Sequence, residues 1–192
     1  MKTQILSLSL IAALSVFSCN KTVQPETTTA QPIKKDSGEI VAYGKYLVTI
    51  TGCNDCHSPK KMGPNGPELI PELLLSGYQS NRAIPKFDQT RAKVGFAQMN
   101  EDMTAAAGPW GISFAANLTP HPTGLGNWNV EQFKKAMMHG KSKGMDNGRM
   151  LLPPMPWFNY TAMKDEDAEA IFAYLQSLKP VENVVPATVQ FK

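Results

Sequence analysis

Two cysteines and a histidine stand together in the pentapeptide Cys53-Asn54-Asp55-Cys56-His57, which is called the pentapeptide below. Two thiols with this spacing can each form a thioether to one vinyl group of the same porphyrin. A histidine directly after the second thiol is then held under the iron, where its imidazole can be an axial ligand. The spacing therefore predicts that Cys53 and Cys56 attach one haem covalently and that His57 ligates its iron.

Three other uses of a Cys-x-x-Cys pair fit this sequence less well. A thioredoxin-like site requires strand–helix–strand context, whereas residues 43–52 have the pattern of a short helix. A structural zinc site needs four ligands, and the pentapeptide offers three in a chain with only 3 cysteines. A structural disulfide between Cys53 and Cys56 is the remaining alternative.

A six-coordinate iron needs a second ligand opposite His57, and Met155 is the predicted one. Three prolines surround Met155; they fix φ and remove backbone donors, so the loop presents one side chain from a stiff backbone. A thioether ligand also favours reduced iron. Met150 and Met145 in the same loop are the alternatives, and packing of Met155 against Trp157 is the interpretation without a ligand role.

The amino terminus has the features of an export signal. Residues 1–18 carry one early lysine and a mostly apolar run, which is too short to span a membrane comfortably. The sequence Val16-Phe17-Ser18-Cys19 resembles the lipobox of bacterial lipoproteins, which predicts a lipidated Cys19. Cleavage near this site without lipidation would leave Cys19 as a free thiol in an oxidising compartment, which is unfavourable.

Composition sets the domain organisation. Residues 19–38 are rich in Thr, Gln, Lys, Ser and Pro and predict a flexible tether. A single domain is expected over residues 39–182, followed by a tail at 183–192, because 42% hydrophobic content suffices for one ordinary core. The net charge of +3 gives no strong basic excess, so nucleic-acid binding is not expected.

Helical periodicity indicates three helices, at residues 39–52, 129–139 and 165–178. Asn129, with Gln132 three residues later, has the spacing of a capping box at the start of the second helix. Residues 58–116 are rich in proline and glycine and have no clear period, so a long loop-rich insert is expected there. The expected fold class is therefore all-α, with several short helices around one haem.

Together these features resemble a class I c-type cytochrome of the bacterial, monohaem kind. Besides the pentapeptide, the matching motifs are Asn117–Pro120, Gly124–Trp128 and Met155–Trp157. The resemblance covers residues 40–57 and 115–182. It is similar to cytochrome c subunits of periplasmic dehydrogenases.

The resemblance implies a function and a helix arrangement. It implies single-electron transfer by one covalent haem c, with its iron held by His57 and Met155, outside the cytoplasm and without enzymatic activity. It also implies that the first and last helices cross at Gly44 and Tyr174. The expected partners are redox proteins, namely a dehydrogenase, an oxidase or another cytochrome, together with a membrane reached through lipidated Cys19.

Two alternatives to a free carrier stay open. One is a fixed haem subunit of a membrane-associated dehydrogenase or oxidase complex, with the 58–116 insert as binding surface. The other is a haem sensor or peroxidase with an open iron site. For a carrier, five cations before the Met155 loop are a candidate docking patch, although a solvated surface explains them equally well: Lys134, Lys135, Lys141, Lys143 and Arg149.

Overall fold

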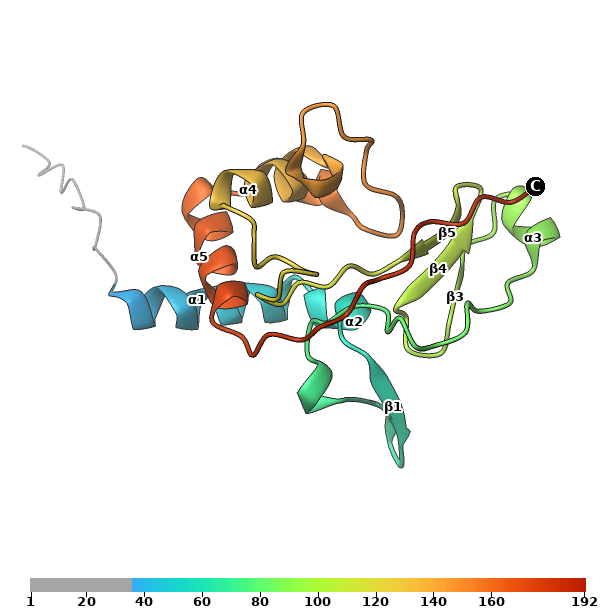
Figure 1. Cartoon of the computed structure of the whole chain (residues 1–192), viewed down its shortest axis with the longest axis horizontal. Helices are drawn as coiled ribbons and strands as arrows, with labels where there is room; N and C mark the ends of the chain where they lie inside the picture. Colours follow the sequence, from blue (N-terminus) through green and yellow to red (C-terminus); the bar gives the residue numbers. More distant parts are fainter. Residues whose placement is uncertain (1–35) are drawn as a thin grey trace, which may run out of the picture. The chain divides into compact units, whose positions relative to one another are not determined.

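The computed structural model describes residues 36–192 (Figure 1). The predicted leader, the lipidation site at Cys19 and nearly all of the predicted tether lie outside the described residues. Helix α1, Ser37–Ile50, opens the folded part. The Asp36 carboxylate accepts a hydrogen bond from the Glu39 N–H at 2.8 Å, and the Glu39 carboxylate accepts one from the Asp36 N–H at 3.2 Å. This reciprocal capping box starts α1 inside the last residues that were expected to belong to the tether.

Helix α1 crosses the last helix, α5, which spans Asp165–Gln176 (Figure 1). At the crossing, a Cβ added to Gly44 would lie 1.9 Å from the carbonyl oxygen of Ala170 and 2.9 Å from the Cβ of Tyr174. Only a residue without a side chain allows the two helices to approach this closely. The crossing at Gly44 and Tyr174 that the resemblance implied is thus confirmed.

Helix α4, Val130–His139, completes the helical part of the molecule. The Asn129 side chain caps its first turn, in a capping box with Gln132 that the sequence predicted. The Phe133 ring of α4 packs on the Phe172 ring of α5, with centroids 5.4 Å apart. The buried core lies among these three helices and the segments around them: Leu47, Val48, Leu75, Leu125, Phe133, Met137, Ala170, Ile171 and Leu175.

The expectation of an all-α fold is wrong, because the 58–116 insert contains strands. One antiparallel sheet pairs two strands and the other has the order β3-β4-β5. The strands are β1 Lys60–Gly63, β2 Gly66–Leu69, β3 Gln98–Met99, β4 Ala105–Gly108 and β5 Gly111–Phe114. Each has two to four residues, which is too short to show an alternating pattern, and all four residues of β4 are buried. The sequence therefore gave no periodic signal for them.

Several shorter helices fill the rest of the described chain. They are α2 Cys53–His57, η1 Pro71–Leu73, α3 Gln89–Lys93, η2 Ser142–Gly144 and η3 Trp157–Tyr160. Within residues 36–192, none of the helices has the length and apolar character that crossing a membrane requires.

The C-terminal tail packs on the insert and runs beside β5 (Figure 1). Ile112 and Val189 exchange backbone hydrogen bonds at 2.7 and 3.0 Å. Upstream, the buried Asn183 side chain donates to the carbonyls of Ser76 and Tyr78 at 2.7 and 2.9 Å. The tail therefore ties the insert to the end of α5.

Candidate cofactor site

The pentapeptide forms a short helix of its own, α2. Gly52 precedes it in the left-handed conformation, with φ 70°, and this lets the chain turn out of α1 into α2. Cys53 and Cys56 are half-buried and free rather than joined in a disulfide. Positions three apart share one face of a helix, so both thiols face the same side, as attachment to one porphyrin requires.

The imidazole of His57 is oriented by the insert. Its Nδ1 lies 2.8 Å from the carbonyl oxygen of Ala116, and because a carbonyl only accepts, Nδ1 carries the proton. Nε2 therefore keeps its lone pair, which is the form that ligates a metal. Burial lowers the pKa of His57, while the Ala116 hydrogen bond raises it, and the net lowering favours the neutral ring. These residues fit a haem with His57 as proximal ligand.

The backbone of His57 is held from the same side. Its carbonyl accepts a hydrogen bond from the Gly77 N–H at 2.8 Å. Gly77 has φ +77°, and a Cβ there would lie 2.4 Å from the carbonyl oxygen of Ala115. Two residues of the insert therefore meet at His57, Ala116 fixing its ring and Gly77 its backbone.

The loop that carries Met155 is fastened at two points. Ser113 Oγ of β5 donates a hydrogen bond to the carbonyl of Pro153 at 2.6 Å. The Tyr160 hydroxyl donates to the carbonyl of Thr51, next to the pentapeptide, at 3.3 Å. These contacts connect the loop to β5 and to a residue just before the pentapeptide. They would hold Met155 in place if it served as a haem ligand.

The exposure of the three candidate methionines differs. Met145 and Met150 expose 54% and 40% of their surface, whereas Met155 is half-buried. A thioether ligand in a dry pocket must be shielded from water, and Met155 is the least exposed of these three side chains. The assignment of Met155 stays a prediction.

The surroundings of the thiols argue against a thioredoxin-like site and against a structural zinc site. Burial raises the pKa of both Cys53 and Cys56, whereas a catalytic dithiol needs a lowered one. Among residues 36–192, no three His, Cys, Asp or Glu side chains are grouped to hold a metal ion, as a closed zinc site would require.

Fewer than five cations of the predicted docking patch are available for docking, because two of them pair with carboxylates. Lys134 is 8% exposed, and its ammonium contacts Glu169 at 2.7 Å and Asp165 at 2.9 Å. Lys135 pairs with Asp146 at 2.6 Å. Lys134 was therefore wrongly included, because it serves to join α4 to α5. The other three cations of the patch have no carboxylate within ion-pair distance in the described chain: Lys141, Lys143 and Arg149.

Sequence reasoning missed the residues that hold the site in place. Ala116 acts through a backbone carbonyl, which no residue type signals, although it stands directly before the Asn117–Pro120 motif. Ser113 and Tyr160 carried no periodic or motif signal either. Their roles depend on contacts between segments far apart in the chain.

Comparison with known proteins gives a family assignment for the C-terminal part. The family model described as "Cytochrome c" matches residues 111–179. This range contains α4, α5 and the Met155 loop, and it does not include the pentapeptide.

Three curated relatives are cytochrome subunits of dehydrogenases. The fructose dehydrogenase cytochrome subunit of Gluconobacter japonicus is 27% identical over 182 residues, which cover 94% of this chain and 29% of the relative. The gluconate 2-dehydrogenase cytochrome c subunit of Pantoea cypripedii is 39% identical over 77 residues, 39% of this chain and 17% of the relative. The alcohol dehydrogenase (quinone), cytochrome c subunit of Gluconacetobacter polyoxogenes is 37% identical over 75 residues, 38% of this chain and 15% of the relative.

This chain thus spans less than a third of the length of each of these relatives. The family match and the relatives confirm the resemblance drawn from the sequence motifs. Residues 111–179 therefore match a cytochrome c domain, a kind of domain that binds haem c and its iron covalently, and the chain is homologous to cytochrome c subunits of dehydrogenases.

Proposed function

We propose that this protein transfers single electrons outside the cytoplasm through one haem c that is attached to Cys53 and Cys56 and ligated by His57 and Met155. The observation that carries the proposal is the His57 ring, whose Nδ1 is hydrogen-bonded to the Ala116 carbonyl, in a pentapeptide whose two thiols are not joined in a disulfide. When bound, the haem iron supplies the chemistry by accepting and releasing one electron.

The chain contributes rigidity. Ala116 and Gly77 hold the ring and backbone of His57, and Ser113 and Tyr160 fasten the loop of Met155. Ligands that are fixed in this way move little between the two oxidation states, which keeps the reorganisation small. No group in this arrangement is asked to make or break a substrate bond, which is in keeping with an electron-transfer role.

The spectrum of the exported holoprotein tests the axial ligands. The protein is produced with a haem-maturation system, and its oxidised and reduced spectra are compared with those of Met155→Ala and of Met145→Ala as control. A covalent low-spin spectrum whose far-red sulfur-to-iron band disappears only in M155A is expected. If the band persists in M155A, another methionine, Met150 first, is the ligand. If no haem is retained after denaturation, covalent attachment is refuted.

The open-site alternative is separated by carbon monoxide. A haem sensor or peroxidase has a vacant or labile sixth position, so its reduced form binds carbon monoxide readily. The proposed His57–Met155 ligation predicts slow and weak binding in the wild type and rapid binding in M155A.

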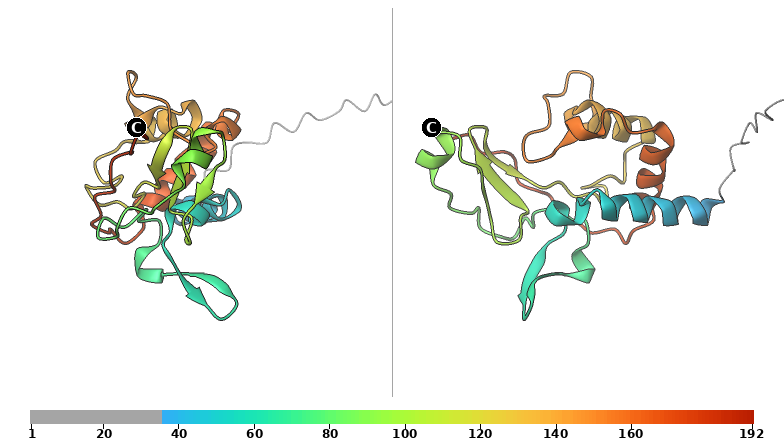
Figure 2. Two further views of the ribbon diagram at one scale, coloured as in Figure 1. Left: turned by 90° about the vertical axis from the view of Figure 1, so that its right-hand side faces the viewer. Right: turned by 180° about the vertical axis from the view of Figure 1, so that it is seen from behind.

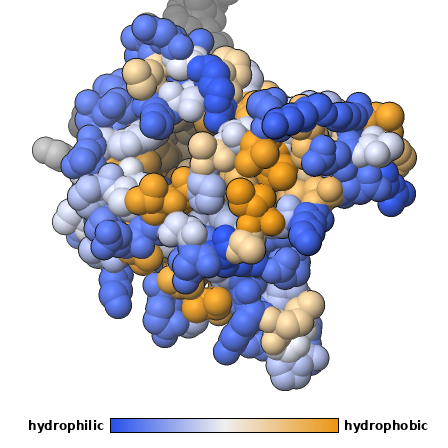
Figure 3. All heavy atoms as spheres, turned by 45° about the vertical axis from the view of Figure 1, so that its right-hand side comes forward, coloured by the Kyte–Doolittle hydropathy of each residue, from blue (hydrophilic) through white to orange (hydrophobic). Residues whose placement is uncertain are grey.

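A fixed haem subunit of a dehydrogenase complex is the second candidate, and exposed apolar side chains favour it. Figure 3 shows apolar side chains gathered in the middle of one face of the molecule, and exposed apolar patches mark interaction sites. The large apolar residues that the insert exposes are Met62, Leu69, Ile84, Val94, Phe96, Met99 and Met103. The names of the relatives, which are subunits of dehydrogenases, point the same way.

Gentle purification from the native membrane distinguishes the two candidates. A fixed subunit is recovered with a dehydrogenase in constant ratio, and Val94→Ser with Phe96→Ser releases it while the haem spectrum stays normal. A free carrier is recovered alone, and the double variant changes nothing. Tyr46→Ser, which alters an apolar residue of α1 that is 57% exposed, is the matched control.

Export and anchoring complete the proposal. Residues 1–18 would serve as a lipoprotein-type leader, Cys19 as the lipidated residue and residues 20–35 as the tether, since the capping box of α1 begins at Asp36. The resemblance implies that bacteria attach haem c outside the cytoplasm, and this supports the assignment. Mass spectrometry of the mature amino terminus tests it, with Cys19→Ser expected to lose the acyl mass and to appear in the soluble fraction.

A further inference from the structure

Lys60 begins strand β1 just after the pentapeptide, and its side chain lies against backbone carbonyls rather than in solvent. Its Nζ is within hydrogen-bond distance of four carbonyl oxygens, those of Asp55 at 2.7 Å, Ser58 at 3.0 Å, Asp102 at 3.0 Å and Asn54 at 3.2 Å. An ammonium offers three N–H donors. A neutral amine offers only two, so this cage of carbonyls acts in favour of the charged form. Burial acts against it and outweighs the neighbouring charge of Asp102, so the pKa of Lys60 is lowered.

The cage closes the C-terminal end of helix α2. In a longer helix, the Asp55 carbonyl would accept from the residue four positions on, which here is Pro59, and proline has no N–H. The Lys60 ammonium donates to that carbonyl in its place, at 2.7 Å. A cation at a helix C-terminus is also favourable to the helix dipole. Lys60 thus replaces the missing helical donor of the pentapeptide.

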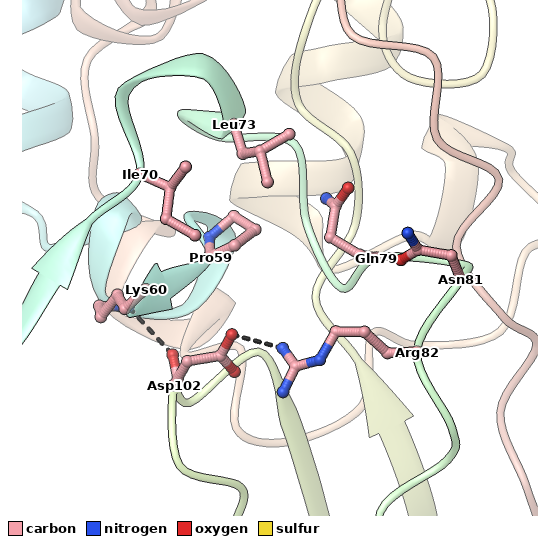
Figure 4. A pocket seen from close by; sticks show the side chains of 8 residues that line it. All are labelled: Pro59, Lys60, Ile70, Leu73, Gln79, Asn81, Arg82 and Asp102. Atoms are coloured by element: carbon pink, nitrogen blue, oxygen red, sulfur yellow. Dashed lines mark hydrogen bonds and ion pairs between the residues drawn. The ribbon is translucent and has the colours of Figure 1, made fainter. Parts of the chain in front are cut away.

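The carbonyl of Asp102 connects this end of α2 to the three-stranded sheet. Asp102 lies between β3 and β4, and its side chain is 2% exposed. Its carboxylate accepts from Arg82 Nη1 at 2.5 Å and from Thr104 Oγ1 at 2.6 Å (Figure 4). Lys60 therefore rests on a backbone segment that is itself held rigidly.

The ammonium of Lys60 has no ion-pair partner in the described chain, although the more distant carboxylates of Asp102 and Asp55 act on its charge. Within residues 36–192, its ammonium forms no ion pair with a carboxylate, and the carboxylate of Asp102 is directed to Arg82 (Figure 4). Lys60 is half-buried, so solvent screens its charge less than that of a surface lysine. A positive charge held beside the pentapeptide favours the state of the site that contains one more electron.

We propose that Lys60 is a positioning residue that locks the C-terminal end of the haem-attachment helix and whose fixed charge raises the reduction potential of the cofactor. This inference rests on the proposed attachment of haem at Cys53 and Cys56. It assigns to the insert a role in tuning the site, in addition to the hydrogen bonds that the insert gives to His57.

A redox titration of the exported holoprotein tests the proposal, with the haem content per chain measured on the same samples. Lys60→Met removes the charge and the cage, and Lys60→Arg keeps the charge. Lys61→Met is the matched control, because it removes the same charge from an exposed side chain at the next position. K60M is expected to shift the midpoint potential downward, K60R to stay closer to the wild type, and K61M to show little change.

The outcomes separate the inference from the proposed function. Absence of covalent haem from the wild type would refute the proposed function itself. Normal haem content and an unchanged potential in K60M would refute the inference and leave the function standing. Equal shifts in K60M and K60R, or in K60M and K61M, would refute the electrostatic role. Loss of haem in K60M but not in K61M would establish the positioning role. Since K60M would then have no midpoint potential to measure, K60R would report the effect of the charge.

Discussion

Gly44 of α1 rests on the backbone of Ala170 of α5, so closely that a Cβ at Gly44 would lie 1.9 Å from the Ala170 carbonyl oxygen. The obstacle is backbone, which cannot rotate away as the end of a long side chain can. This contact sets the distance between the first and last helices. Because the pentapeptide follows α1 directly, the contact also connects the pentapeptide segment to the last helix, α5.

Gly44→Ala is therefore expected to destabilise the protein. Alanine improves the helix propensity of α1 by about 0.5–1 kcal/mol, but forcing the helices apart costs about 1–3 kcal/mol or more. Urea denaturation should show a net loss of unfolding free energy. Lys45→Ala, at the exposed neighbouring position, is the control and should be nearly neutral. A stabilised G44A would mean that the helices separate without cost.

Acid should weaken the protein through Asp102. Burial alone would raise the pKa of this carboxyl, but hydrogen bonds from Thr104 and the ion pair with Arg82 outweigh it and leave the pKa below 3.8. Because the folded pKa is the lower one, the ionised carboxylate stabilises the fold fully above the unfolded pKa. That stabilisation is lost as the pH falls through the folded value.

Asp102→Asn should accordingly reduce stability at neutral pH by about 1–3 kcal/mol and should flatten the loss of stability below about pH 4. Thermal melting between pH 2 and pH 7 measures both effects. Glu182→Gln, an exposed carboxylate in the tail, serves as control. An unchanged acid profile in D102N would assign the acid sensitivity to other carboxylates.

Removing Lys134 should loosen the packing of α4 on α5. Its ammonium lies among Asp165, Glu169 and Glu131, and hydrogen bonds to Glu169 and Asp165 raise the pKa of Lys134. A raised folded pKa means that this stabilisation is complete at neutral pH and is lost only at strongly alkaline pH. Lys134→Met leaves the carboxylates unpaired, so we expect a lower Tm than for Lys135→Met, whose parent side chain has one exposed partner. Equal melting temperatures would contradict a joining role for Lys134.

Partner docking should depend on the cations that remain available. Lys141→Glu with Lys143→Glu is expected to slow electron transfer to or from the partner at low salt. The difference should disappear at high salt, since charges are screened over about 10 Å at 0.1 M. Stopped-flow mixing with the purified partner over a range of ionic strength measures this effect. Lys179→Glu, which reverses one lysine charge outside the patch, is the control. A double variant that reacts as fast as the wild type at low salt would show that these cations do not steer docking.

The sequence by itself determined the chemistry and the local helices. The spacing of Cys53, Cys56 and His57 predicted covalent haem, and the cytochrome c match bears out this cofactor. The capping box at Asn129 and the apolar faces of α4 and α5 predicted their helices, because capping and helical periodicity are contacts between near neighbours in the chain. The glycine at position 44 and the aromatic at 174 were identified through the resemblance to a family.

Only the tertiary structure decided what the insert does. Its strands are too short to show a period, so the expected all-α fold failed there. The carbonyl that orients His57, the cage around Lys60 and the burial of Lys134 join residues that are distant in sequence. Backbone carbonyls carry no residue-specific signal, and a lysine has the same letter whether it faces solvent or fills a cage. Which of these roles each residue takes is fixed by packing between distant segments.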